Sequence, residues 1–233
     1  MQSFEDFKIS KQLQYAITDL GYETPTPIQV KAFPVISSGK DVVGIAQTGT
    51  GKTFAYMLPI LQGLKFSKEK HPRVLILVPT RELVVQTVDE IKKFSKYINH
   101  RVIGVFGGTN INTQKAEVAL GQDIIVATPG RLYDLVVSRA LQLKSIKKLV
   151  IDEVDVMLDL GFRFQLNNIF DLLPQRRQNI MFSATMTDDV NLLISNFFKA
   201  AEKISVAVSG TPLDNILQSS YFVPNFYKWL NAS

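Results

Sequence analysis

The sequence predicts an α/β domain with a mostly parallel sheet and helices on both of its faces. Short apolar runs alternate with helical patterns along most of the 233 residues, and buried strands that alternate with helices are typical of parallel sheets. A glycine-rich loop joins one such run to one such helical pattern. Polar stretches follow five of the runs, which is where ligands bind in sheets of this type.

Composition narrows the class of protein. Hydrophobic residues make up 46% and charged residues 20%, as in ordinary soluble chains. No apolar run approaches the roughly 20 residues that span a bilayer, and no basic and apolar leader is present, so we expect a cytoplasmic protein without membrane contact. Cysteine is absent, which excludes disulfides and thiolate metal sites. The net charge of +5 is compatible with a polyanionic partner and equally with ordinary solubility.

The N-terminal part predicts a helix followed by a rigid loop. Residues 8–20 show helical periodicity, with Ser10 as a candidate N-cap and Gly21 as a candidate residue just beyond the C-terminus. The prolines of the loop 21–29 exclude helix until about residue 27. In this loop Tyr22 can stack on a planar ring, and Gln29 offers both a donor and an acceptor. From these residues alone, a capped loop between two helices is the better interpretation.

The glycine-rich stretch follows the apolar run 42–45 and precedes the helical pattern 54–61; it reads Ala46-Gln47-Thr48-Gly49-Thr50-Gly51-Lys52-Thr53. A strand, a glycine turn and a helix in this order form a phosphate cradle, because the turn points backbone N–H groups inward and the helix N-terminus adds its positive dipole. Lys52 can reach β- and γ-phosphates, and the Thr53 hydroxyl can bind Mg²⁺. The strict P-loop pattern has glycine where this chain has Ala46, whereas the relaxed pattern fits.

The remaining chain supplies further strands and helices. We expect strands at 74–78, 102–106, 123–127, 149–151 and 179–182, and helices at about 82–98, 111–120, 130–138, 162–173 and 187–198. The polar stretches that follow these strands are Pro79-Thr80-Arg81-Glu82-Leu83, Gly107-Gly108-Thr109, Thr128-Pro129-Gly130-Arg131, Asp152-Glu153-Val154-Asp155 and Ser183-Ala184-Thr185. Five such stretches at one edge of a sheet, beside a phosphate loop, predict a single functional surface.

Two kinds of chemistry fit this surface. Asp152 at a strand end can hold Mg²⁺ through water, and Glu153 can orient or deprotonate an attacking water; a solvated acidic loop is the plainer interpretation. Arginines, hydroxyls and backbone N–H groups of glycines are the usual donors to nucleic-acid phosphates. Such groups stand at Arg81, Gly107, Gly108, Thr109, Thr128, Gly130 and Arg131. Because no run of aromatic residues accompanies them, we expect backbone contact with little sequence specificity, although helix capping would also explain single threonines and glycines.

Together these motifs resemble those of the DEAD-box ATP-dependent RNA helicases, in order and spacing, over about residues 4–230. The resemblance implies a RecA-like P-loop domain that binds ATP, Mg²⁺ and RNA. It implies an adenine-reading Q motif at 21–29, and it accounts for Ala46. The nucleotide-binding residues it implies are Phe4, Tyr22, Thr24, Gln29, Gln47, Thr48, Gly49, Thr50, Gly51, Lys52 and Thr53, with Thr53 and Asp152 at Mg²⁺ and Lys52, Asp152 and Glu153 catalytic.

The same resemblance assigns the other motifs. It implies RNA-backbone contacts by Pro79, Thr80, Arg81, Gly107, Gly108, Thr109, Thr128, Pro129, Gly130 and Arg131. It also implies that Ser183 and Thr185 couple hydrolysis to domain closure through Asp155. Val154 departs from the family, which has alanine there; we expect its extra methyl groups to leave the chemistry intact.

The family has two RecA-like domains, and this chain is expected to hold one. We interpret residues 1–208 as the ATP-binding domain, and 209–233 as a linker and the start of a second domain. Without the arginine fingers of the second domain, we expect very slow hydrolysis and no unwinding. Two rival functions stay open, a DNA-directed helicase or translocase of the same superfamily, and an RNA clamp or assembly scaffold.

Overall fold

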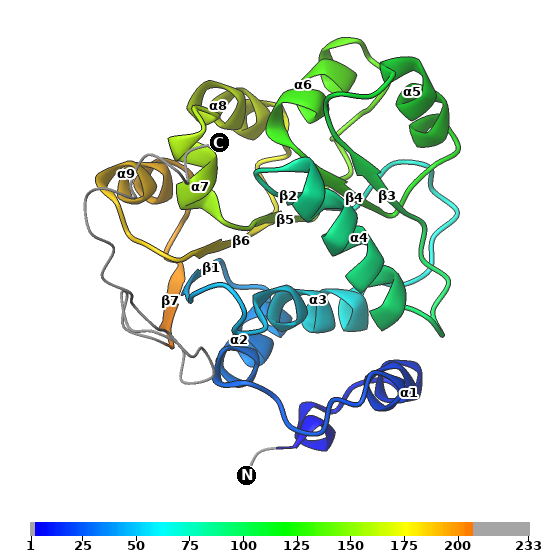
Figure 1. Ribbon diagram of the computed structural model, residues 1–233, viewed down its shortest axis with the longest axis vertical. Coiled ribbons are helices and arrows are strands. Elements are labelled where there is room, and N and C mark those ends of the chain that lie inside the picture. The colour runs from blue at the N-terminus through cyan, green and yellow to red at the C-terminus, as the bar shows by residue number, and fades with distance from the viewer. Residues whose placement is uncertain (1–2, 207–233) are drawn as a thin grey trace, which may run out of the picture.

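In the computed structural model, the structure is described for residues 3–206 (Figure 1). The expected start of a second domain, 209–233, therefore lies outside the described residues. In chain order the elements are η1 (Phe4–Phe7), α1 (Lys11–Asp19), α2 (Pro27–Ser37), β1 (Val42–Ile45), α3 (Lys52–Gly63), β2 (Val74–Leu77), α4 (Arg81–Phe94), β3 (Val102–Val105), α5 (Ile111–Ala119), β4 (Ile124–Ala127), α6 (Pro129–Val137), β5 (Lys148–Ile151), α7 (Val154–Asp159), α8 (Arg163–Leu172), β6 (Gln178–Ser183), α9 (Asp188–Phe197) and β7 (Glu202–Ser205).

The strands of the described range form one seven-stranded sheet in the order β3-β4-β2-β5-β6-β1-β7. Every pairing in it is parallel, which confirms the predicted fold class. Helices α2, α3 and α4 cover one face, with α1 beyond them, and α5 to α9 cover the other (Figure 1). Because all strands run the same way, the loops that follow them meet at one edge of the sheet.

Side chains of each strand divide between two apolar cores. In β2, Val74 and Ile76 belong to the core under α3 and α4, whereas Leu75 and Leu77 belong to the core under α6 and α8. This alternation follows from the two-residue period of a strand. Burial of both faces explains why the strands appear in the sequence as continuous apolar runs.

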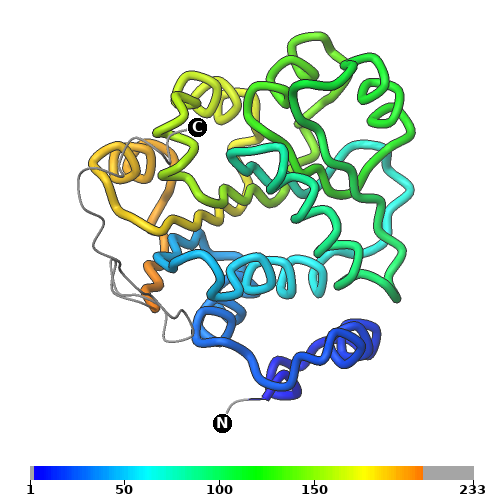
Figure 2. Tube along the Cα trace, in the orientation of Figure 1, coloured from blue at the N-terminus to red at the C-terminus, as the bar shows by residue number. Residues whose placement is uncertain are grey.

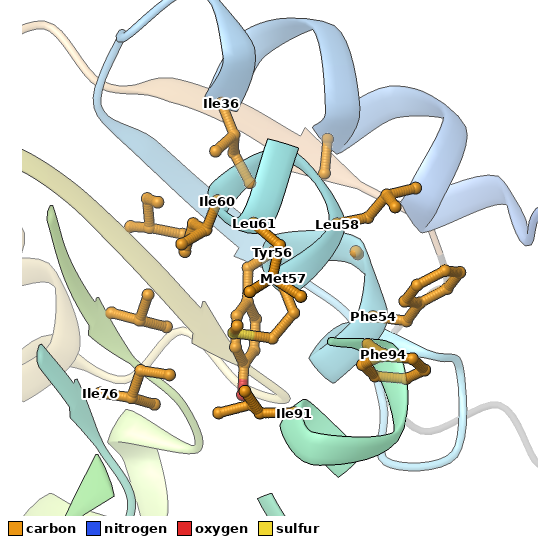
Figure 3. Close-up of a cluster of buried hydrophobic side chains, with 14 of the residues drawn as sticks. Ile36, Phe54, Tyr56, Met57, Leu58, Ile60, Leu61, Ile76, Ile91 and Phe94 are labelled. Atoms are coloured by element: carbon orange, nitrogen blue, oxygen red, sulfur yellow. The ribbon is translucent and has the colours of Figure 1, made fainter. Parts of the chain in front are cut away.

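Helix α3 lies at the centre of one core. It is buried on almost all sides, between the sheet and α2, and its Tyr56 and Met57 are fully enclosed (Figure 3). The ring of Tyr56 packs against Phe182 of β6 with centroids 5.7 Å apart. Because α3 is fixed along its length, its N-terminus is a rigid platform for the loop that precedes it.

The helix starts show why the sequence folds in this way locally. Ser10 caps α1 by accepting a hydrogen bond from the N–H of Leu13 at 3.4 Å, which confirms the expected N-cap. Pro27 occupies the first position of α2, where its missing N–H is harmless. Helix α1 begins later than the expected residue 8, because Lys8 has a left-handed backbone (φ 49°) that ends the short helix η1. In Figure 2, α1 lies beside the end of α4, where Lys96 and Tyr97 bind Asp19.

Besides the short helix η1, two elements of the structure are absent from the sequence-based expectations. Strand β7 pairs with β1 at the edge of the sheet, but of its side chains only Ile204 is buried, so it lacks the apolar run of the other strands. Helix α7 begins within the acidic motif, at Val154, and has six residues, too few for helical periodicity to show. Within residues 3–206, no helix is both long enough and apolar enough to cross a membrane.

Candidate functional site

The glycine-rich loop joins β1 to α3 as the sequence predicts. Gly49 and Gly51 have positive φ angles of 79° and 86°, which residues with a Cβ atom rarely adopt. A Cβ at Gly51 would also lie 2.5 Å from the Nε2 atom of Gln29. The hydroxyl of Thr50 donates to the carbonyl of Gln47 at 2.7 Å and closes the loop from within. The loop ends at the N-terminus of α3, whose unpaired N–H groups favour an anion.

A cavity of about 560 Å³ opens beside this loop. Most of the residues predicted to bind nucleotide line it, namely Phe4, Tyr22, Thr24, Gln29, Thr48, Gly49, Gly51, Lys52 and Thr53, and Asp152 and Glu153 line it as well. Gln47 and Thr50 are not among its lining residues. The chain thus brings together residues that lie up to about 150 positions apart in the sequence.

An acidic group and a basic group face each other at the end of the cavity near the sheet. The Nζ atom of Lys52 lies 3.8 Å from the Oδ1 atom of Asp152, and both side chains are buried. Burial raises the pKa of the Asp152 carboxyl to about 6. The positive charge of Lys52 lowers this pKa, and the negative charge of Glu153 raises it further. The ammonium of Lys52 is buried and makes no hydrogen bond. Burying an ammonium without hydrogen bonds costs free energy. A bound anion that accepts hydrogen bonds from Lys52 would offset this cost.

The same end of the cavity offers oxygen ligands for a cation. Thr53 and Asp152 both line it, and a hydroxyl with a carboxylate is a donor set that Mg²⁺ accepts together with several waters. Glu153 stands next to them with a left-handed backbone (φ 54°), a conformation that is uncommon for a non-glycine residue. The residues present therefore fit a magnesium ion bound through water.

The other end of the cavity is aromatic. The ring of Tyr22 lies 5.5 Å from that of Phe54 and 6.4 Å from that of Phe94, and Tyr22 is 46% exposed. Gln29 accepts a hydrogen bond from the N–H of Thr26 at 2.9 Å and donates to the carbonyl of Gly51 at 3.3 Å. Its amide keeps a second N–H and a second lone pair for a ligand. This end of the cavity can bind a flat ring with polar groups at its edge. Through its hydrogen bond to Gly51, Gln29 connects this end to the phosphate loop.

Sequence reasoning missed the wall of the cavity that α4 supplies. The residues of this wall are Leu83, Gln86, Thr87, Glu90 and Phe94. In the sequence, Leu83 and Phe94 are indistinguishable from the apolar face that α4 presents to the core. Only the three-dimensional course of α4 beside α3 reveals this role.

The acidic motif and the Ser183-Ala184-Thr185 stretch are in direct contact. The Oδ2 atom of Asp155 accepts hydrogen bonds from both the N–H and the hydroxyl of Thr185, each at 2.9 Å. Ser183 donates its hydroxyl to the carbonyl of Thr185 at 2.6 Å and shapes the turn. The structure therefore links the ends of β5 and β6 through a buried carboxylate.

The stretches after β2, β3 and β4 form a second polar surface. Arg81 is exposed, and its guanidinium lies over the ring of Phe106 at 5.0 Å. Gly107, Gly108 and Thr109 are exposed, whereas Thr128 and Pro129 are buried. The hydroxyl of Thr80 accepts a hydrogen bond from the N–H of Leu83, so at this residue the capping interpretation applies.

Arg131 points into the protein on this surface. Its Nη1 atom donates to Gln114 at 2.9 Å, its Nη2 atom donates to the carbonyl of Thr109 at 3.0 Å, and its side chain is 9% exposed. Sequence reasoning missed Gln114, because a single glutamine on a helix gives no signal of its own.

A glycine-rich loop at a helix N-terminus, a buried lysine and a carboxylate at the end of β5 define a P-loop nucleotide-binding domain. The comparisons with known proteins make this class more specific. The family model for the DEAD/DEAH box helicase matches residues 26–193. The chain belongs to this family.

Curated relatives carry matching names. The chain is 38% identical over 222 residues to the ATP-dependent RNA helicase DeaD of Escherichia coli K12, covering 95% of this chain and 35% of that protein. It is 39% identical over 229 residues to the DEAD-box ATP-dependent RNA helicase 24 of Arabidopsis thaliana, covering 97% and 30%. The chain thus spans about a third of the length of these relatives.

A solved structure has the same fold. It is the crystal structure of a hypothetical ATP-dependent RNA helicase from Sulfolobus tokodaii, with a TM-score of 0.79 and 33% identity over 85% of this chain and 57% of the other. The expected family membership and fold class are therefore confirmed.

Proposed function

We propose that this chain is the ATP-binding half of an ATP-dependent RNA helicase. The observation that carries the proposal is the buried ammonium of Lys52, which makes no hydrogen bond and lies 3.8 Å from Asp152 beside the glycine loop. A phosphate group would satisfy this ammonium. The names of the curated relatives support the choice of RNA helicase among nucleotide-driven enzymes.

The residues of the cavity divide the work. Lys52 and the N–H groups of the loop bind the phosphates, and Gln29 with Tyr22 holds the adenine. Thr53 and Asp152 would hold Mg²⁺, which neutralises charge on the phosphates when bound. Glu153, at the rim of the cavity, orients the attacking water and takes up its proton.

RNA binds the second polar surface along its sugar-phosphate backbone. The exposed groups there are the guanidinium of Arg81 and the backbone of Gly107, Gly108 and Thr109, none of which reads bases. Threonine hydroxyls and glycine N–H groups suit a strand that carries 2′-hydroxyls. Asp155 and Thr185 connect this chemistry to the closure of a second RecA-like domain, which separates the strands of a duplex.

Comparing RNA with DNA tests this proposal. We would titrate the chain against a labelled single-stranded RNA and a DNA of the same sequence, at low ionic strength, and follow fluorescence anisotropy. We expect tighter binding of RNA. Equal binding of both strands would favour a DNA-directed translocase of the same superfamily, and binding of neither would overturn the nucleic-acid part of the proposal.

A further inference from the structure

A buried polar hub lies beneath the surface proposed to bind RNA. Its centre is Gln114 of α5, which is 6% exposed. The Nε2 atom of Gln114 donates to the carbonyl of Phe106 at 3.2 Å and to the hydroxyl of Thr109 at 2.9 Å. Its Oε1 atom accepts from the Nη1 atom of Arg131 at 2.9 Å. These partners fix the orientation of the amide, because Arg131 can only donate and the Phe106 carbonyl can only accept.

Arg131 completes the hub from the start of α6. Besides Gln114, its guanidinium binds the carbonyl of Thr109 through Nη2 at 3.0 Å, and its Nε atom lies 3.9 Å from the carboxylate of Asp134. With 9% of its side chain exposed, Arg131 has few donors left for a ligand at the surface. Its planar fork instead ties the 106–109 loop to the N-terminus of α6.

The hub also reaches the exposed cation of this surface. It holds the backbone of Phe106, and the ring of Phe106 supports the guanidinium of Arg81 at 5.0 Å. The hydroxyl of Thr109 donates to the same carbonyl at 3.3 Å. Displacing Gln114 would therefore release the glycine loop and the aromatic platform of Arg81 together.

We propose that Gln114 and Arg131 are positioning residues for the RNA backbone, and that Arg81 rather than Arg131 is the cation that contacts phosphate. This inference rests on the proposed RNA-binding function of the same surface. It assigns a role to Gln114 and changes the expected role of Arg131 from a phosphate ligand to an internal brace.

Salt dependence distinguishes a brace from a phosphate ligand. Each phosphate contact with single-stranded nucleic acid contributes about 0.7 to the slope of log K against log salt concentration. We expect Arg81→Gln to weaken RNA binding and to reduce that slope by about 0.7. We expect Gln114→Ala to weaken binding about tenfold with an unchanged slope.

Arg131→Lys provides a second, independent test. Lysine keeps the charge but cannot make two bonds from a planar fork. If Arg131 is a brace, RNA affinity falls about as much as in Gln114→Ala and the slope stays the same. If Arg131 is a phosphate ligand, affinity stays close to that of the wild type and the inference is wrong.

Controls separate positioning from general damage. Gln122→Ala removes an amide whose hydrogen bond goes to the carbonyl of Glu117 within its own segment, and it should leave RNA affinity unchanged. ADP affinity should be unchanged in every variant, because the hub does not line the nucleotide cavity. If Gln114→Ala also loses ADP binding, this variant is damaged as a whole, and Arg131→Lys then decides whether the hub positions the RNA-binding surface.

The outcomes also separate this inference from the function on which it rests. A wild-type chain that binds no RNA overturns the proposed function, and the inference with it. A wild-type chain that binds RNA, with Gln114→Ala and Arg131→Lys unchanged in affinity, overturns the inference alone.

Discussion

At the scale of single residues, Asp152 is held in balance between two opposing influences. Burial favours its neutral form, whereas the ammonium of Lys52 at 3.8 Å favours its charged form. The resulting pKa of about 6 lies about two units above the ordinary value of an aspartate. Below this pH the carboxyl is mostly protonated and is not available to a cation.

This balance predicts a pH dependence of nucleotide binding. Because Mg²⁺ requires the ionised carboxylate, protonation of Asp152 below about pH 6 competes with the metal. From pH 7.5 to pH 5.5, we expect the affinity for ADP with Mg²⁺ to fall about fourfold beyond the titration of ADP itself. Calorimetric titrations across this range measure the effect.

Two controls accompany the pH series. Without Mg²⁺ the affinity for ADP should not fall with Asp152 protonation, since a neutral carboxyl no longer repels phosphate. Asp152→Asn should bind ADP with Mg²⁺ more weakly and show only the titration of ADP. An undiminished fall in this variant would assign the pH effect to another group.

Val154 of the acidic motif is fully buried. Its neighbours in the core include Met157 and Leu166. Val154→Ala removes two methyl groups and leaves a cavity, so we expect the free energy of unfolding to fall by about 1–3 kcal/mol. For a domain of this size that lowers the melting temperature by about 3–10 °C, which thermal unfolding followed by circular dichroism detects.

The same substitution should leave nucleotide affinity within a few-fold, because Val154 does not line the cavity. ADP titration of the folded variant checks this. A large gain in affinity would instead identify the valine as a restraint on the site.

Residues differ in how far the sequence reveals them. The glycine loop, Lys52, Asp152 and Glu153 could be assigned to one site because their chemistry and spacing point to a phosphate and a cation. The inward course of Arg131 could not be predicted, because it depends on Gln114, which lies 17 positions away in the sequence. In the sequence, a hydrogen-bond donor side chain at a strand end looks the same whether it points to solvent or into the protein interior.

At the scale of elements, β1 and β6 approach each other closely where Gly44 faces Phe182. A Cβ at Gly44 would lie 2.4 Å from the ring of Phe182, which is itself fully buried against Tyr56. The phosphate loop begins two residues later. The glycine is required by this close packing, since its φ angle is not positive.

Gly44→Ala should therefore destabilise the domain. Overpacking of this kind typically costs about 1–3 kcal/mol, and denaturant unfolding of both proteins measures the difference. Gly63→Ala is a matched control, because an added Cβ there meets no atom within 4 Å and alanine favours the end of α3. We expect the control to be neutral or slightly stabilising. Equal stability of Gly44→Ala and the wild type would contradict the packing argument.

Elements with strong apolar patterns were predicted, and elements without them were missed. The strands with apolar runs and the longer helices appear in the structure near their expected places. The polar strand β7 pairs with β1, and its own residues give no sequence signal of a strand. Helix α7 starts shortly after β5, with Glu153 in a left-handed conformation at its N-cap.

At the scale of the whole molecule, parallel strands place all the motifs at one edge of the sheet. This arrangement was predictable, since it follows from strand direction alone. The resemblance implied the link between Asp155 and Thr185, which the structure contains, whereas the wall that α4 adds to the cavity required the structure. The chain spans about a third of the length of its curated relatives.

The purified 233-residue chain should hydrolyse ATP very slowly, with or without RNA. Arginine fingers from a second domain contribute about 10³–10⁵-fold to turnover in related phosphoryl transfer. A coupled assay of steady-state phosphate release tests this, with Lys52→Ala as the control for contaminating activity. Brisk turnover that Lys52→Ala abolishes would mean that the first domain is sufficient.

The most direct test of the account is the choice between ADP and GDP. Calorimetric titration of the chain with each nucleotide in the presence of Mg²⁺ measures it, and Gln29→Ala serves as the matched variant. We predict clear preference for ADP, lost in Gln29→Ala, because the amide of Gln29 reads the edge of adenine. Equal affinity for both nucleotides would keep the phosphate loop but contradict the adenine-reading site and, with it, the assignment as an ATP-driven RNA helicase domain.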